Sequence, residues 1–166
     1  MIDVGGPGAH CRAMQKRLDQ SGYMEIALEE ARAAQARGEV PVGAVLVGPD
    51  GAIVARDGNR TLELCDPTAH AEILVIRAAC KAARSERLAD HDLYVTLEPC
   101  TLCAGAISFA RLRRLYFGAD DPKMGGVEHG VRFFAQPSCH HRPQVIAGLA
   151  ATESAVLLRD FFAKRR

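Results

Sequence analysis

Two short segments of this chain carry side chains that can share one metal ion, and they restrict the fold because such an ion requires both segments to meet. The first is His70-Ala71-Glu72 and the second is Pro99-Cys100-Thr101-Leu102-Cys103. Two cysteines separated by two residues can bind one tetrahedral Zn²⁺, and a single histidine brings the protein ligands to three. Three protein ligands leave a fourth position for water, which is typical of a catalytic zinc site rather than a structural one.

Glu72 is the candidate general acid and base of this site. Its carboxylate can take a proton from water, deliver it to a ring nitrogen and later protonate a departing amine. Residues two apart do not share a helix face, so His70 and Glu72 converge only if the chain is entering a helix at His70. We therefore expect both segments at helix N-termini, where the helix dipole stabilises negative charge. A buried histidine and a redox cysteine pair are the alternative interpretation, which either segment alone would favour.

The composition indicates one globular domain. With 166 residues, 48% of them hydrophobic and 25% charged, the chain is neither disordered nor a membrane protein. A net charge of +1 implies that any RNA binding comes from local patches. A chain of this size does not need disulfides, so its six cysteines favour a reducing cytoplasm, with no membrane partner. Cys139, His140 and His141 do not indicate a second metal site, because adjacent histidines rarely converge.

Hydrophobic periodicity predicts alternating helices and strands after a flexible leader over residues 1–22. The strand, helix and strand expected between residues 93 and 118 imply a parallel crossover. Asp66 followed by Pro67 is expected to cap the second helix, and Thr152 the last. The predicted fold of residues 23–166 is a three-layer α/β/α arrangement, in which helices cover both faces of a mixed five-stranded sheet. The expected helices are 23–37, 70–84, 101–110 and one from 152, and the expected strands are 42–47, 53–56, 93–97, 115–118 and 145–149.

Longer stretches around these motifs resemble the bacterial tRNA-specific adenosine deaminases, over roughly residues 23–166. The resemblance implies a zinc-dependent homodimer with a cytidine-deaminase-like fold. It also implies hydrolytic deamination of adenosine to inosine at the wobble position (34) of a tRNA anticodon, typically that of tRNA-Arg(ACG). The stretches that carry it are EVPVGAVLV (39–47), Asn59-Arg60, DPTAHAEI (66–73), LYVTLEPCTLCAGAI (93–107), FGADDPK (117–123) and Phe161-Phe162.

The resemblance also implies roles for individual residues. His70, Cys100 and Cys103 correspond to the zinc ligands, and Glu72 corresponds to the proton shuttle. The remaining positions concern the substrate. Asn59 corresponds to the side chain that hydrogen-bonds the flipped base, and the lining of its pocket corresponds to Val40, Ala71 and Pro99. Asp121 and Lys123 correspond to a loop that binds the neighbouring nucleotides. Phe161 and Phe162, beside the basic residues at 164–166, suit base stacking next to phosphate contacts.

Simpler interpretations of the substrate residues remain open. Asn59 is also compatible with a turn, and Asp121 and Lys123 with an ordinary solvated pair. One of Phe161 and Phe162 is expected in the core. The loop at residues 125–134 departs from the family pattern, which affects nucleotide contacts rather than chemistry.

Two other functions share the zinc motif. The first is deamination of a free base or nucleoside, such as guanine or cytosine, which needs no RNA surface. The second is a catalytically silent, zinc-containing RNA-binding module, against which the presence of Glu72 argues.

Overall fold

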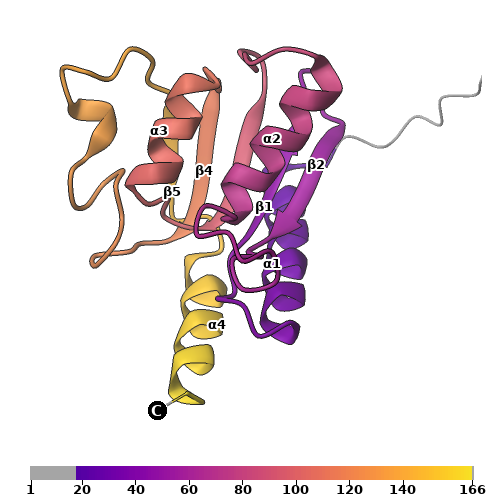
Figure 1. Ribbon diagram of the computed structural model, residues 1–166, viewed down its shortest axis with the longest axis vertical. Helices are drawn as coiled ribbons and strands as arrows, with labels where there is room; N and C mark the ends of the chain where they lie inside the picture. Colours follow the sequence, from indigo (N-terminus) through magenta and orange to yellow (C-terminus); the bar gives the residue numbers. More distant parts are fainter. Residues whose placement is uncertain (1–17, 166) are drawn as a thin grey trace, which may run out of the picture.

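The computed structural model describes residues 18–165, which form four α-helices, one five-stranded sheet and a single 3-10 turn (Figure 1). Most of the predicted leader, residues 1–17, lies outside this range. The helices are α1 (Gln20–Ala36), α2 (Ala71–Ala83), α3 (Thr101–Phe109) and α4 (Ala151–Ala163), and the strands are β1 (Gly43–Val47), β2 (Ile53–Gly58), β3 (Asp92–Leu97), β4 (Arg114–Ala119) and β5 (Gln144–Ala147).

The sheet is mixed, with strand order β2-β1-β3-β4-β5. Strand β1 pairs antiparallel with both β2 and β3, whereas β3, β4 and β5 run parallel. The β3-α3-β4 segment is therefore the parallel crossover that the sequence predicts. This crossover places the carboxyl end of β3 directly before the N-terminus of α3, where the two cysteines lie.

Helices cover both faces of the sheet, which confirms the predicted three-layer α/β/α architecture. Helices α1 and α4 pack on one face and α2 and α3 on the other, where Figure 1 shows α2 and α3 in front of the strands. Alternate strand residues supply the two faces: Leu46 and Leu93 pack under α2 and α3, whereas Val45 and Tyr94 pack under α1. On the α1 side, the rings of Tyr94 and Tyr116 stack with centroids 4.4 Å apart.

Strand β1 and helix α1 approach each other closely at Gly43. A Cβ atom at this position would lie 2.0 Å from the carbonyl oxygen of Ala27. Only a residue without a side chain fits there, because backbone atoms of the helix fill the space. The turn from α1 into β1, which carries Glu39 and Val40, is thereby held against the sheet.

The structure corrects several expected element boundaries. Helix α1 begins at Gln20, before the expected Tyr23, because Asp19 caps it: its Oδ1 accepts a hydrogen bond from the Gly22 N–H at 2.8 Å. The predicted Asp66 cap of α2 is wrong. Asp66 instead closes the preceding turn, where its carboxylate accepts bonds from the Thr68 N–H and hydroxyl at 2.8 and 2.7 Å.

The boundaries of α4 and β5 also differ from those expected from the sequence. Thr152 does not cap α4, since the helix begins one residue earlier, after Ala150 in a left-handed conformation (φ 58°). Strand β5 begins at Gln144 and ends at Ala147, two residues short of the expected end. Within residues 18–165, no helix combines the length and apolar composition needed to cross a membrane.

Candidate active site

His70, Cys100 and Cys103 lie together where α2 and α3 begin. His70 is the N-cap residue of α2 and Cys100 that of α3, both with extended backbone, and Cys103 lies in the first turn of α3. The Nδ1 atom of His70 lies 3.6 Å from the Sγ of Cys100 and 3.4 Å from the Sγ of Cys103. Within residues 18–165 they are the only group of three His, Cys, Asp or Glu side chains placed to hold a metal ion.

These distances fit a zinc ion. Zn–N bonds of about 2.0–2.1 Å and Zn–S bonds of about 2.3 Å in a tetrahedron separate nitrogen from sulfur by about 3.6 Å. Hydrogen bonding with Cys103 and His70, which outweighs burial, lowers the pKa of the Cys100 thiol to about 4. The adjacent Cys100 sulfur and burial both raise the pKa of Cys103. One thiolate is therefore present at neutral pH, and the second thiol must lose its proton when a cation binds.

Glu72 lies beside this group, one residue inside α2, and is buried. Burial raises its pKa to about 7, with a further contribution from the charge of Cys100. A carboxyl group that titrates near pH 7 can both accept and release a proton under physiological conditions. His70 precedes the helix with φ −75° and ψ 150°, so the expected arrangement, with the chain entering α2 at His70, is confirmed.

Asn59 is connected directly to the start of α2. Its Oδ1 accepts a hydrogen bond from the backbone N–H of Ala71 at 2.9 Å, and its own N–H donates to the Val42 carbonyl at 3.0 Å. Because the Ala71 N–H can only donate, the amide oxygen must point toward it and the Nδ2 group must point elsewhere. Asn59 therefore joins the end of β2 to the residue that follows His70, which a simple turn residue would not do.

Two of the three expected pocket-lining residues adjoin the metal-binding group in the sequence, and the third, Val40, packs against the core. Ala71 and Pro99 are buried and directly adjoin the ligands His70 and Cys100. Val40 is partly buried and packs against the core cluster that contains Ala71. They are small or rigid apolar residues, which is the character expected of a wall against a flat base.

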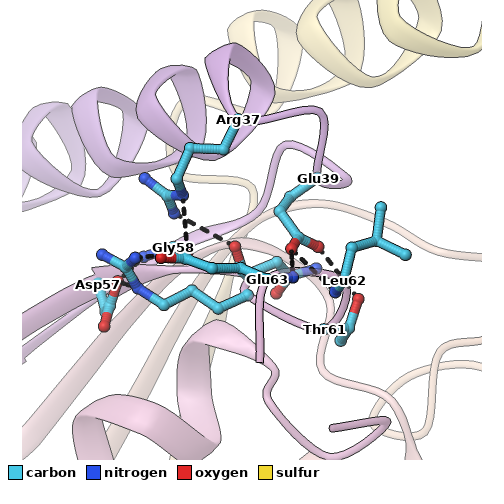
Figure 2. Close-up of polar contacts among 9 residues, drawn as sticks. Arg37, Glu39, Asp57, Gly58, Thr61, Leu62 and Glu63 are labelled. Atoms are coloured by element: carbon cyan, nitrogen blue, oxygen red, sulfur yellow. Dashed lines mark hydrogen bonds and ion pairs between the residues drawn. The ribbon is translucent and has the colours of Figure 1, made fainter. Parts of the chain in front are cut away.

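A buried glutamate that the sequence analysis does not identify fixes the segments around Val40 and Asn59. Figure 2 shows Glu39 pointing at the loop after β2, where its carboxylate accepts bonds from the N–H groups of Leu62 and Glu63, at 2.9 Å each, and from the hydroxyl of Thr61 at 3.1 Å. Burial opposes the charged form, but these hydrogen bonds outweigh it and hold the pKa of Glu39 below its ordinary value. The only sequence signal is a charged residue directly before the apolar stretch at residues 40–47.

Arg37 adds a second connection to this loop. Its guanidinium donates to the backbone carbonyl of Asn59 at 3.2 Å and lies 3.4 Å from the carboxylate of Glu63 (Figure 2). Arg60 in turn pairs with Asp57 at 2.8 Å. Arg37 and Glu39, which follow α1, therefore both bind the loop that carries Asn59.

Comparison with known proteins supports the zinc assignment and identifies the family. Residues 17–119 match the family described as the cytidine and deoxycytidylate deaminase zinc-binding region. The chain is 65% identical over 148 residues to the tRNA-specific adenosine deaminase of Agrobacterium fabrum, covering 89% of this chain and 97% of that protein. The chain belongs to the tRNA-specific adenosine deaminase family.

Solved structures place this tRNA-specific adenosine deaminase family member among related folds. A structure from a study of A-to-I editing by tRNA:A34 deaminases at the wobble position is 66% identical, with a TM-score of 0.82, over 84% of this chain and 100% of that one. A guanine deaminase from Bacillus subtilis is 30% identical, with a TM-score of 0.61, over 89% of this chain and 94% of that one. The cytidine-deaminase-like fold expected from the sequence is confirmed.

Asp121 and Lys123, the candidate nucleotide contacts of this deaminase, lie on the loop after β4. The Asp121 carboxylate accepts bonds from the N–H groups of Lys123 and Met124 at 3.1 and 3.0 Å, so it caps a turn. Among the described residues no ion pair joins Asp121 to the Lys123 ammonium. The loop therefore presents an exposed lysine on a fixed turn.

Phe161 does not fit the base-stacking role that the sequence suggests. It is only 5% exposed, and the guanidinium of Arg165 covers its ring at 4.0 Å from the centroid. Arg165 also donates to the carbonyl of Gly38 at 2.6 Å, which ties the end of α4 to the end of α1. Phe162 is 50% exposed. One phenylalanine of the pair thus belongs to the core, as expected, and the residue open to solvent is Phe162.

Proposed function

We propose that this protein converts adenosine to inosine at position 34 of a tRNA anticodon, with tRNA-Arg(ACG) as its substrate. The observation that carries the proposal is the buried Glu72 next to the His70, Cys100 and Cys103 group, in a chain 65% identical to a tRNA-specific adenosine deaminase. The net reaction adds water at C6 of the purine and releases ammonia.

His70, Cys100 and Cys103 would hold one zinc ion per chain, which supplies Lewis acidity that lowers the pKa of water. Glu72 takes the proton from the attacking water and delivers it to N1 of the purine ring. After attack at C6, the carboxylate takes a second proton from the new C6 hydroxyl and gives it to the departing amine, so that ammonia leaves and the C6 carbonyl of inosine remains. The pKa of Glu72, raised to about 7 by burial, suits both steps.

Several residues would bind the flipped base and its neighbours, and the amide orientation of Asn59 indicates its own contact. Its oxygen is occupied by the Ala71 N–H, so Nδ2 donates to a ring acceptor of a base flipped out of the anticodon loop. Val40, Ala71 and Pro99 form the apolar walls of the pocket. Asp121 and Lys123 bind the flanking nucleotides through the turn that they form. Phe162, rather than the buried Phe161, stacks on an unpaired base.

We further propose that the protein acts as a homodimer in a reducing cytoplasm. Helix α3 exposes Leu102 and Phe109, and Phe109 is 79% exposed, which is costly for a large apolar ring. A second copy of the chain would cover this face. A reducing compartment keeps Cys100 and Cys103 available as ligands. Sedimentation of the wild-type protein and of Phe109→Ser tests the dimer, which the variant should weaken.

The decisive experiment compares an arginine tRNA anticodon stem-loop carrying ACG with free adenosine, cytidine and guanine. Inosine formed at position 34, measured by mass spectrometry of the digested RNA, supports the proposal, and turnover of free bases alone contradicts it. Binding of the stem-loop without turnover would indicate the silent RNA-binding module instead. A stem-loop with other sequence around the same adenosine tests the preference for tRNA-Arg(ACG).

Glu72→Gln provides the matched test of the mechanism. The amide keeps the size of the side chain but cannot carry the proton, so we expect activity to fall by at least about 10²-fold while one zinc per chain remains. Metal analysis and turnover are measured on the same sample. Full activity in the variant would remove Glu72 from its role.

A further inference from the structure

Glu98 is a buried carboxylate at the junction of β3 and α3, two residues before Cys100. Its side chain has no exposed surface. Five hydrogen bonds reach it, and all come from the loop after β4. The donors are the backbone N–H groups of Asp121 at 2.9 Å, Val127 at 3.2 Å, Glu128 at 2.8 Å and His129 at 2.9 Å, together with Nδ1 of His129 at 2.7 Å.

The same loop also contacts the metal-binding segment through its backbone. Gly125 forms an isolated antiparallel bridge with Cys100, and the Gly126 N–H donates to the Pro99 carbonyl at 2.9 Å. A Cβ atom at Gly125 would lie 2.5 Å from Cδ of Glu98. The loop therefore rests directly on the segment that carries Cys100, with no free space between them.

We propose that Glu98 is a positioning residue for RNA binding, which fixes residues 121–129 so that Asp121 and Lys123 meet the nucleotides beside the target base. Glu98 holds the N–H of Asp121, and the Asp121 carboxylate in turn holds the N–H groups of Lys123 and Met124. The conformation at Lys123 thus depends on a buried charge. This inference rests on the proposed function, because it assumes that the loop contacts RNA.

The chemistry of a carboxylate explains why this position needs one. Two ionised oxygens accept hydrogen bonds from several N–H groups at once, and such charge-assisted bonds are stronger than neutral ones. An amide offers one acceptor oxygen and an NH₂ group, which would face either the Asp121 N–H or the three N–H groups at 127–129. In either orientation, buried backbone N–H groups lose their acceptor. The loop then loses its bond to Glu98 either at Asp121 or at residues 127–129.

The test compares wild-type protein with Glu98→Gln and with the control Asp92→Asn. Asp92 lies at the opposite end of β3 and accepts hydrogen bonds from Arg113 at 2.9 and 2.8 Å, away from the loop. In Glu98→Gln we expect the amides of Asp121 and of residues 127–129 to exchange hydrogen at least about tenfold faster. We expect the KM for the stem-loop to rise about tenfold, with kcat within about twofold and one zinc per chain retained.

Asp92→Asn should lower the melting temperature without changing KM or the exchange of the loop. Glu98→Asp keeps the charge but is one methylene shorter, so its KM should lie between those of wild type and Glu98→Gln. If Glu98→Gln does not fold, His129→Ala removes a single hydrogen bond at the partly exposed side of the anchor and should change both readouts in the same direction, by less.

Two results would overturn the inference. Unchanged amide exchange at 121 and 127–129 would show that Glu98 does not fix the loop. Loss of zinc or of kcat with an unchanged KM would show that Glu98 serves the metal-binding segment alone. The amide-exchange comparison uses protein without RNA, so it tests whether Glu98 fixes the loop independently of activity. Failure of the wild-type protein to deaminate the stem-loop would contradict only the proposed function.

Discussion

Asn59 has a structural contact in the fold and, in the proposed function, a second contact with the substrate. Its amide oxygen accepts the N–H of Ala71, one of the first N–H groups of α2 that have no partner within the helix. In the proposed function, its Nδ2 group donates to the base. Single substitutions can separate these two roles of the amide.

Asn59→Asp is expected to keep the structural task and lose the binding task. A carboxylate still accepts the Ala71 N–H and suits a helix N-terminus, but it has no hydrogen to donate to the base. We expect a melting temperature close to that of wild type and a kcat/KM for the stem-loop at least about tenfold lower. Asn59→Ala should lose both tasks. Equal kcat/KM in wild type and Asn59→Asp would contradict a donor role.

Glu39→Gln should destabilise the protein in a pH-dependent way. Its pKa is lower in the folded protein than its ordinary value of 4.5, so the unfolded chain binds the proton first as the pH falls. At pH 7 we expect the variant to lose about 1–3 kcal/mol of unfolding free energy. This difference from wild type should shrink as the pH drops below about 4.5 and through the folded pKa.

Urea unfolding of both proteins at pH 7 and at acidic pH values measures this difference. Glu86→Gln is the control, because its side chain is 83% exposed and pairs with the exposed Arg87 at 3.5 Å. It should be neutral at every pH. If the loss of unfolding free energy in Glu39→Gln stayed constant down to strongly acidic pH, the role of the ionised carboxylate would be contradicted.

Among the elements, the contact of α1 with β1 positions the turn that carries Glu39 and Val40. Gly43→Ala should cost about 3 kcal/mol or more, because the added methyl group would lie 2.0 Å from the Ala27 carbonyl, which belongs to helix backbone. Gly48→Ala is the matched control at the other end of β1. Its Cβ would meet side-chain atoms of Asp50 and Val54 at 3.2 Å, and the nearest backbone atom, the Ala52 carbonyl oxygen, lies at 3.7 Å. Denaturant unfolding compares the two, and equal costs would contradict the close contact.

Local sequence signals predict the existence of elements better than their ends. The β-branched and apolar runs correctly locate all five strands, of which β1, β3 and β4 are buried on both faces, whereas β2 and β5 are partly exposed. Asp66 and Thr152 are reasonable caps by residue type, but neither caps a helix. Asp66 finds nearer donors in Thr68, and α4 begins where the chain leaves β5 with Ala150 in a left-handed conformation. These choices depend on neighbours in space rather than on residue preference.

At the scale of the whole molecule, a metal ion would join segments 30 residues apart, since His70 and Cys100 come from different helices. Removing zinc with a chelator under reducing conditions should therefore lower the melting temperature by about 10 °C, as expected for loss of a tightly bound ligand. Re-addition of zinc should restore it. Cys100→Ser should behave like the chelated protein, whereas Cys65→Ser, at an exposed cysteine, should retain zinc and its melting temperature. A chelator-insensitive melting temperature would contradict a zinc site that joins the two helices.

The sequence by itself determined the chemistry and the architecture. The motifs around His70, Cys100 and Cys103 predicted a three-ligand metal site with Glu72 as the proposed proton carrier, and the hydrophobic pattern predicted a sheet covered on both faces. Tertiary structure alone decided how this site is held. Glu39 and Glu98 bind backbone groups 23 to 31 residues away, and the packing of α4 decided that Phe161 is buried and Phe162 exposed. Residue patterns record local preference, whereas a buried carboxylate is stabilised by whichever N–H groups the fold brings to it.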